Sequence, residues 1–553
     1  MRYHSLAAPG AALVASAVVM AWPAAAQVVD RPVAGRMPVG IDIVHYDFAI
    51  SLPDTGSAIS GVSTMLLRRQ PEGRNLAVDI LLTVDSVLVD GARTAATRRE
   101  GGISVPLGTE ADSARVTVFY HGAPRDGLII SRDPEGRWQA FGDNWPDRAR
   151  HWLAVVDRPG DKATVSWTID APTELTVVAN GARTDSTRDA ARPWRSTWRW
   201  EERHPIATYL MVIAAAPLRA EPLPSTKCLT TADAGCLTQT VYVSKDAKPG
   251  YPPAFGEAEG IVAFYSSLVG PFPYEKLAHL QSTTRFGGME NATAIFYADG
   301  LFRNGTIGSS IVAHETAHQW FGDAVTESEW PHLWLSEGFA TYFAELWAER
   351  SRGRDTLVAH MREIRAGLLG DSDVVARRPV IDTAQTDLMQ LLDANSYQKG
   401  GYVLHMARRL LGDSVFFRGV RGYYAGHRDG NATSDDLRRA LEGASGRDLG
   451  WFFDQWLRRP GYPEIDTRWS YDPREQRVYL EIAQRRRFGN FRLPLVVELV
   501  RKNGTTRRAT IEVPAQSSSR IVVPIDLDAP PARVILDPDA DLLAAISAPR
   551  RQR

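Results

Sequence analysis

Residues 314–337 read HETAHQWFGDAVTESEWPHLWLSE. His314 and His318 are four residues apart, so on a helix their side chains project from the same face, one turn apart. After eighteen intervening residues comes Glu337, at the start of what the pattern predicts to be a second helix. Two imidazoles and one carboxylate can occupy three corners of a zinc tetrahedron and leave the fourth for water. The stretch therefore predicts a catalytic zinc site with His314, His318 and Glu337 as ligands.

Glu315 lies between the two histidines and is expected to act on the water rather than on the metal. It projects about 100° round the helix from His314, so it is not placed to be a ligand. From there it can accept a proton from the water and later pass it to a leaving amine. The alternative is a buried helix with two hydrogen-bonded histidines and no metal. We favour the metal site because a third ligand follows at the start of the next predicted helix.

Length and composition indicate a multidomain globular protein. A chain of 553 residues is too long for one hydrophobic core, so about three or four domains are expected. The chain is 44% hydrophobic and 23% charged, and its formal net charge of -1 leaves no basic surface for nucleic acid. We therefore expect no nucleic-acid partner.

The first 26 residues resemble a secretory signal peptide rather than part of the fold. Arg2 supplies a positive start, an apolar stretch follows from Leu6 to Trp22, and Ala24 to Ala26 fit a cleavage site. The alternative is a transmembrane anchor, but the run is short and interrupted by proline, and spanning needs roughly 20 apolar residues. We expect an exported protein, periplasmic or secreted, with no stable membrane anchor after cleavage.

The hydrophobic period changes twice along the mature chain. Strand-like alternation dominates 27–242, which predicts an N-terminal β domain. Helical spacing dominates 243–458, including predicted helices at 309–323, 337–352 and 397–412, and this region is expected to be an α+β catalytic domain. The period returns to two in 459–553, which predicts a small β-sandwich.

The two cysteines, Cys228 and Cys236, lie close together in the sequence. In an exported chain this spacing favours a small structural disulfide. Two free thiols, or half of a metal site, are the alternatives.

At these residues the chain resembles the aminopeptidase N-like zinc metallopeptidases, the gluzincin group that includes leukotriene hydrolase. HExxH followed by eighteen residues and Glu is the signature of that family, and HETAHQWFGDAVT and LWLSEGFATYF match beyond the ligands. The resemblance implies a multidomain α+β fold with a saddle-like N-terminal β-sheet domain, a thermolysin-like, mainly helical catalytic domain and a small C-terminal β-sandwich. It also implies one Zn²⁺ per chain and the removal of N-terminal residues from peptides. The chain would be a bacterial-type exported member that lacks the large C-terminal helical domain of many relatives.

Two further motifs carry residue roles by this resemblance. Gly287, Gly288, Met289, Glu290 and Asn291 look like the exopeptidase motif of the family, which runs along the substrate and whose glutamate binds the free α-amine. Its second residue is Gly288, where alanine is usual. Tyr397, in Ser396 to Gly400, looks like the tyrosine that donates a hydrogen bond to the oxyanion.

One family feature has no match in the sequence. The second amine-binding residue, a glutamine or glutamate, falls at about Trp145, and the neighbouring Asp143 or Asn144 could take its place. The residues that shape the pocket for the N-terminal side chain are expected around Phe286, Met289 and Trp145.

Two other functions compete with a zinc aminopeptidase. One is a leukotriene hydrolase-like enzyme that also opens epoxides. The other is a catalytically silent scaffold that keeps the fold for protein binding. A silent scaffold is expected to have lost a ligand, the base or the motif glutamate, and this chain retains all of them.

Overall fold

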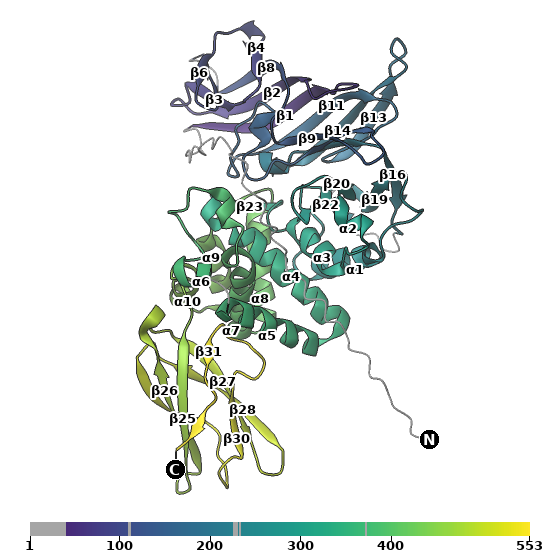
Figure 1. Cartoon of the computed structure of the whole chain (residues 1–553). Coiled ribbons are helices and arrows are strands. Elements are labelled where there is room, and N and C mark those ends of the chain that lie inside the picture. Colours follow the sequence, from purple (N-terminus) through teal and green to yellow (C-terminus); the bar gives the residue numbers. More distant parts are fainter. Residues whose placement is uncertain (1–39, 109–111, 225–229, 232–233, 371–372, 553) are drawn as a thin grey trace, which may run out of the picture.

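The computed structural model describes residues 40–552 apart from 109–111, 225–229, 232–233 and 371–372. Three regions follow one another along the molecule: a β-rich N-terminal region, a largely helical middle region and a C-terminal pair of sheets (Figure 1). This is the multidomain α+β fold that the sequence predicts. Residues 1–26, the predicted signal peptide, lie outside the described residues. Within the described part, no helix has the length and apolar character needed to cross a bilayer.

An eight-stranded sheet forms most of the N-terminal region. Its order is β13-β14-β11-β1-β2-β8-β4-β5, with β1 and β11 parallel. Buried residues alternate with more exposed ones along β2, as expected for a sheet with one face on the core. The strands are β1 (Ile41–Ser51), β2 (Ile59–Arg69), β4 (Thr83–Val89), β5 (Ala92–Arg93), β8 (Ser113–Gly122), β11 (Lys162–Pro172), β13 (Ala182–Arg188) and β14 (Arg195–Ala207).

Two smaller sheets complete this region. One has the order β12-β15-β10-β9 and the other β3-β7-β6. Their strands are β3 (Asn75–Asp79), β6 (Thr97–Arg99), β7 (Gly102–Pro106), β9 (Leu128–Arg132), β10 (Trp138–Gly142), β12 (Thr176–Ala179) and β15 (Ile213–Ala216).

The predicted boundary between residues 242 and 243 falls inside a strand. That strand, β19 (Thr238–Ser244), pairs in parallel with β20 (Lys276–Ser282) and antiparallel with β16 (Leu218–Pro222). The sheet continues through β22 (Ala294–Ala298) to β21 (Gly288–Met289) at its edge. Alternation along the chain identifies a strand but not the sheet that it joins, so the periodicity could not assign β16 and β19 to the catalytic region.

Ten α-helices are described in the middle region. They are α1 (Ala258–Leu268), α2 (Asp299–Arg303), α3 (Ser309–His318), α4 (Trp334–Arg352), α5 (Arg354–Gly370), α6 (Asp373–Arg377), α7 (Gly400–Leu411), α8 (Asp413–His427), α9 (Ser434–Ser445) and α10 (Gly450–Leu457). The helix predicted for 309–323 ends at His318, where the carbonyl of His318 accepts from the N–H of Asp323 and Gly322 adopts a φ of 119°. The helix predicted to begin at Glu337 begins at Trp334. The sequence pattern does not predict α8, because three glycines weaken its helical propensity.

The C-terminal region consists of two facing sheets (Figure 1). One contains β25 (Glu464–Asp472), β26 (Arg477–Gln484), β29 (Ser518–Val522), β31 (Ala545–Ile546) and β32 (Arg550–Arg551). The other contains β27 (Leu493–Val500), β28 (Thr506–Val513) and β30 (Arg533–Leu536). Alternate residues of β26 and β27 are buried, as the two-residue period predicts.

The cysteine pair is described only in part. Cys236 ends β18 (Ala234–Cys236) and is disulfide-bonded. Cys228, the other half of the predicted pair, lies outside the described residues.

Candidate active site

Two helices bring the three predicted metal ligands together. His314 and His318 lie on α3, and Glu337 lies in the first turn of α4. The Nε2 atoms of His314 and His318 are 3.2 Å apart. Oε2 of Glu337 lies 3.3 Å from Nε2 of His314 and 3.4 Å from Nε2 of His318. These atoms form a nearly equilateral triangle of lone pairs.

The triangle has the dimensions of one face of a zinc tetrahedron. Ligand distances of about 2.0–2.2 Å give tetrahedral edges of about 3.3–3.6 Å, close to the three separations observed. Oε2 of Glu337 is buried and has no hydrogen-bond partner among the described residues, as expected of an atom that has a metal to bind. Imidazole nitrogens and a carboxylate oxygen are donors that suit zinc. The residues present therefore fit the metal.

The second nitrogen of His318 is held by the chain itself. Nδ1 of His318 lies 3.1 Å from the carbonyl oxygen of Phe321 and 3.0 Å from Oγ of Ser336. A proton on Nδ1 that donates to these oxygens leaves the lone pair of Nε2 for the metal. Ser336 directly precedes Glu337, so one residue of α4 orients a ligand that lies on α3.

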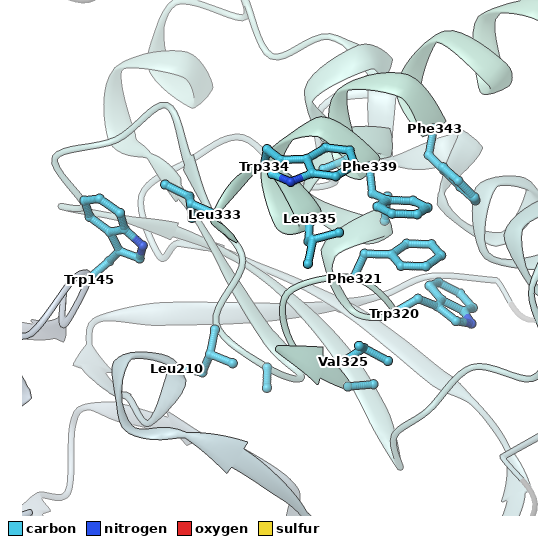
Figure 2. Packing of buried hydrophobic residues seen from close by; sticks show 14 of the residues in the cluster. Trp145, Leu210, Trp320, Phe321, Val325, Leu333, Trp334, Leu335, Phe339 and Phe343 are labelled. Atoms are coloured by element: carbon cyan, nitrogen blue, oxygen red, sulfur yellow. The ribbon is translucent and has the colours of Figure 1, made fainter. Parts of the chain in front are cut away.

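Aromatic packing fixes α3 against α4. The rings of Phe321 and Phe339 stack with centroids 4.1 Å apart, and Phe343 packs on Phe321 at 5.1 Å. Figure 2 shows these rings beside Trp320, Trp334 and Leu335 in one buried cluster. The turn after His318 and the first turns of α4 thus share a core, which keeps the two histidines and Glu337 in register.

Glu315 is buried beside the ligands. It is 5% exposed, and burial raises the pKa of its carboxyl well above the usual range. The edge strand β21 passes directly over it: a Cβ built on Gly288 would stand 2.1 Å from Oε1 of Glu315. The structure therefore brings the predicted base and the predicted substrate motif into contact.

The motif that contains Glu290 runs along the edge of the five-stranded sheet. Met289 pairs with Phe296 of β22, and the carbonyl of Gly287 accepts from the N–H of Ala298. Glu290 is 6% exposed, and burial raises the pKa of its carboxyl to about 7. Asn291 is fully buried, and neither of its side-chain polar atoms has a partner among the described residues.

Tyr397 reaches the same site from a separate segment. It lies in a π-helical turn, Asn395–Lys399, that leads into α7. Its ring stacks on that of His314 with centroids 6.0 Å apart and planes 9° from parallel. Single π-helical turns are frequent at functional sites, but sequence periodicity does not reveal them. The structure thus gathers the three ligands, Glu315, Glu290 and Tyr397 into one site.

Comparison with known families identifies the two larger regions. Residues 256–456 match the peptidase family M1 domain, and residues 87–210 match the peptidase M1 N-terminal domain. The chain belongs to peptidase family M1.

Several M1 proteins resemble this chain at modest identity. Tricorn protease-interacting factor F2 of Thermoplasma acidophilum is 29% identical over 410 residues, which are 70% of this chain and 49% of that protein. Aminopeptidase N of Lactobacillus helveticus is 28% identical over 455 residues, which are 76% of this chain and 51% of that protein. The M1 zinc metallopeptidase of Deinococcus radiodurans has a crystal structure with a TM-score of 0.65 and 25% identity, covering 75% of this chain and 93% of that one. This M1 chain spans about half the length of the two curated relatives.

Gln319, directly after α3 of this M1 chain, is hydrogen-bonded to the segment that contains Glu290. The sequence pattern does not single this residue out. Its Nε2 donates to the carbonyl oxygen of Glu290 at 2.8 Å, and its Oε1 accepts from the N–H of Thr293 at 2.9 Å. The same Nε2 donates to Oδ2 of Asp323 at 2.7 Å. A glutamine directly after the second histidine of HExxH is the only sequence signal, and spacing alone cannot predict which strand it meets.

Both residues suggested for the second amine contact have partners within the fold. Nδ2 of Asn144 donates to the carbonyl of Met211 at 2.6 Å, and its Oδ1 accepts from the indole of Trp152 at 2.8 Å. Asp143 is fully buried and lies between two arginines, 3.3 Å from Arg148 and 3.6 Å from Arg285. The amide of Asn144 is therefore used within the fold, and the charge of Asp143 is balanced by two arginines.

Trp145 packs into an aromatic group at the junction of the two M1 domains. Its ring meets Phe286 edge-on at 6.0 Å and Trp330 at 5.6 Å. Trp330 also contacts Tyr209 at 5.5 Å. Phe286 and Trp145, which are expected near the pocket for the N-terminal side chain, are thus in contact. Trp330 joins them, and the sequence does not single it out.

Proposed function

We propose that this M1 chain is a zinc-dependent aminopeptidase that hydrolyses the first peptide bond of peptides with a free N-terminus. The observation that carries the proposal is the position of Glu290, a buried carboxylate next to the ligand triangle. No salt bridge joins Glu290 to a lysine or arginine in the described part of the chain, and the charges that act on its pKa come from His318 and Glu337. A buried carboxylate needs a cation, and the α-ammonium of a peptide supplies one.

The proposal divides the chemistry among three side chains. When one zinc ion is bound by His314, His318 and Glu337, it lowers the pKa of a coordinated water and polarises a carbonyl oxygen. Glu315 accepts the proton of the attacking water, and its raised pKa suits a group that must then hand the proton to the leaving amine. The hydroxyl of Tyr397 donates to the oxyanion, a contact typically worth about 3 kcal/mol in the transition state.

The resemblance to other M1 proteins supports peptides as the substrate class. One relative is named aminopeptidase N, and a mutant of the Deinococcus radiodurans enzyme was crystallised with a Tyr-Ser-Ala substrate. A tripeptide with a free amine is the kind of ligand that Glu290 and the metal site would hold between them.

The test is the release of a fluorophore from amino-acid amides by the full chain loaded with zinc. We expect release that a chelator abolishes and added zinc restores, and little release from the same amides with an acetylated amine. Cleavage of N-blocked peptides in place of free-amine substrates would refute the aminopeptidase assignment. Inactivity on every substrate, with zinc bound, would favour the silent scaffold.

We also propose that the chain is exported with residues 1–26 removed. The support is the positive start, the apolar run and the small residues before Gln27. Expression in a bacterial host with its own leader, followed by fractionation and N-terminal sequencing, tests this. A cytoplasmic protein that still begins at Met1 would contradict it.

A further inference from the structure

Glu327 is a buried carboxylate that has no hydrogen-bond partner among the described residues. It ends β23 (Val325–Glu327), the short strand between the metal helix and α4, which pairs with β24 (Gly430–Ala432). Glu327 is 1% exposed, and neither of its carboxylate oxygens accepts a hydrogen bond from another residue that the structure describes. A carboxylate in this position is costly unless a cation or a donor reaches it.

The charges that act on Glu327 are those of the active site. Burial raises the pKa of its carboxyl to about 8, and the charges that add to this effect are Glu290 and Glu337. Lys162 is also near enough to respond to the charge of Glu327. Its Nζ, however, donates to the carbonyl oxygens of Asp323 at 2.8 Å, Ala324 at 2.9 Å and Gly430 at 3.2 Å, which uses all three of its protons.

Contacts to other described residues distinguish Glu327 from the other acids of this group. Glu337 belongs to the predicted ligand triangle, and Oδ2 of Asp323 accepts from Nε2 of Gln319 at 2.7 Å. Glu290 has the substrate ammonium under the proposed function. Glu327 belongs to the same buried group of acids, but no described residue forms a salt bridge or a hydrogen bond with its carboxylate.

A chain of aromatic contacts leads from Tyr209 to Trp145, where the second amine-binding residue of the family falls. Burial raises the pKa of the Tyr209 hydroxyl well above its usual range, and Glu327 is the charge that adds most to this effect. The ring of Tyr209 contacts Trp330, which in turn contacts Trp145. Glu327 is buried to a similar extent as the two residues proposed to act on the substrate, since Glu290 is 6% exposed and Glu315 is 5% exposed.

We propose that Glu327 is a specificity-determining residue that acts with Glu290 to select substrates carrying a protonated α-amine. The inference rests on the proposed aminopeptidase function. In a site closed to water, a second negative charge stabilises an ammonium over several ångströms, because little solvent screens it. A carboxylate from β23 thereby supplies the charge that Asp143 and Asn144 cannot supply.

A comparison of two ligands that differ only in the amine tests the proposal. Leucine hydroxamate and 4-methylpentanohydroxamate would be titrated calorimetrically into the zinc-loaded full chain, as wild type and as Glu327→Gln. The isosteric amide keeps the shape of the side chain and removes its charge. We expect leucine hydroxamate to bind roughly 10- to 100-fold more weakly to the variant, and the ligand without the amine to bind equally well to both.

Glu329→Gln is the matched control, because Glu329 is an exposed glutamate two residues further along the same segment. We expect it to leave the affinity of both ligands unchanged. Equal weakening of both ligands by Glu327→Gln would indicate a purely structural residue and overturn the proposal. Unchanged binding of both ligands would overturn it as well.

A second variant keeps the test decisive if Glu327→Gln does not fold. In Glu290→Gln the charge of Glu327 remains, so we expect that variant to retain part of the preference for the ligand with the amine. Complete loss of the preference in Glu290→Gln would exclude a second carboxylate. Failure of the wild type to hydrolyse any free-amine substrate would instead refute the proposed function, which separates the two outcomes.

Discussion

Gly288 lies in direct contact with the carboxylate of Glu315: a methyl group on Gly288 would stand 2.1 Å from Oε1 and 2.3 Å from Cδ of that glutamate. The contact joins an edge strand to the metal helix. Since the side chain of Glu315 is flexible, a methyl group would displace its carboxylate rather than the backbone.

Gly288→Ala is therefore expected to impair Glu315 without removing it. A shift of about 1 Å in a catalytic group can cost up to roughly 100-fold in rate, so kcat should fall while the zinc content stays the same. Steady-state kinetics on a leucine amide, with metal analysis, measure both. Gly287→Ala is the control, since a Cβ there would meet only Ile311 at 3.5 Å. An unchanged kcat in Gly288→Ala would show that Glu315 works equally well from another position.

Glu315→Gln should abolish turnover and keep the metal. The amide preserves the size of the side chain but cannot accept the proton, and the loss of a general base typically costs about 100- to 10,000-fold. Zinc should still bind, because the three ligands do not include Glu315. Stopped assays at high enzyme concentration and metal analysis provide the measurement. Hydrolysis at a rate near that of the wild type would assign the base to another residue.

Tyr397→Phe should lower kcat far more than it raises KM. The phenylalanine keeps the stacking on His314 and removes only the hydroxyl, whose contact forms as the oxyanion develops. The expected loss is about 100- to 1,000-fold in kcat. If KM rises instead and kcat is maintained, Tyr397 binds the ground state and is not the oxyanion donor.

Asp161 is expected to make the stability of the N-terminal region depend on pH. It is 2% exposed, its Oδ1 accepts from the N–H of Ile43, and burial raises the pKa of its carboxyl to about 8. Between the pKa of the unfolded chain, about 3.9, and pH 8, the folded state binds more protons, so the stability falls as the pH rises through this window. Above pH 8 the cost of burying the charge is fully present.

Asp161→Asn should remove this dependence. The amide oxygen can still accept from Ile43, so the variant should exceed the wild type in unfolding free energy by an amount that grows from pH 5 to 8, at up to about 1.4 kcal/mol per pH unit. Urea unfolding followed by tryptophan fluorescence at several pH values measures the difference. Asp47→Asn, at an exposed position of β1, is the control. A difference that is constant with pH would mean that Asp161 does not titrate in this range.

Lys162→Met should loosen the junction between the N-terminal and catalytic regions. Lys162 lies on β11, and its Nζ donates to carbonyl oxygens that all belong to the catalytic region. The loss of one buried donor that serves three acceptors is expected to cost roughly 2–4 kcal/mol of unfolding free energy. Lys248→Met, at an exposed lysine, should have little effect. Equal stability of the two variants would contradict a structural contribution from Lys162.

The sequence by itself predicted His314, His318 and Glu337 as metal ligands, and it determined the class of each region and the order of the motifs. The HExxH spacing is local, since the geometry of one helix sets the distance between His314 and His318. The positions of Glu337, Glu290 and Tyr397 relative to that helix could be expected only through the family resemblance. Burial of one face makes hydrophobic residues recur every two residues in a strand and every 3.6 residues in a helix. These periods identified most strands and helices.

Only the tertiary structure decided which residues surround the candidate active site. It showed that Asn144 and Asp143 have partners within the fold, and that Gln319 joins α3 to the segment containing Glu290. It also showed that Glu327 is buried with no hydrogen-bond partner in the part of the chain that the structure describes. These facts depend on contacts between segments far apart in the chain, and neither spacing nor composition contains them. The predicted domain boundary between residues 242 and 243 falls inside β19 for the same reason, because the pairing partner of a strand is a property of the folded chain.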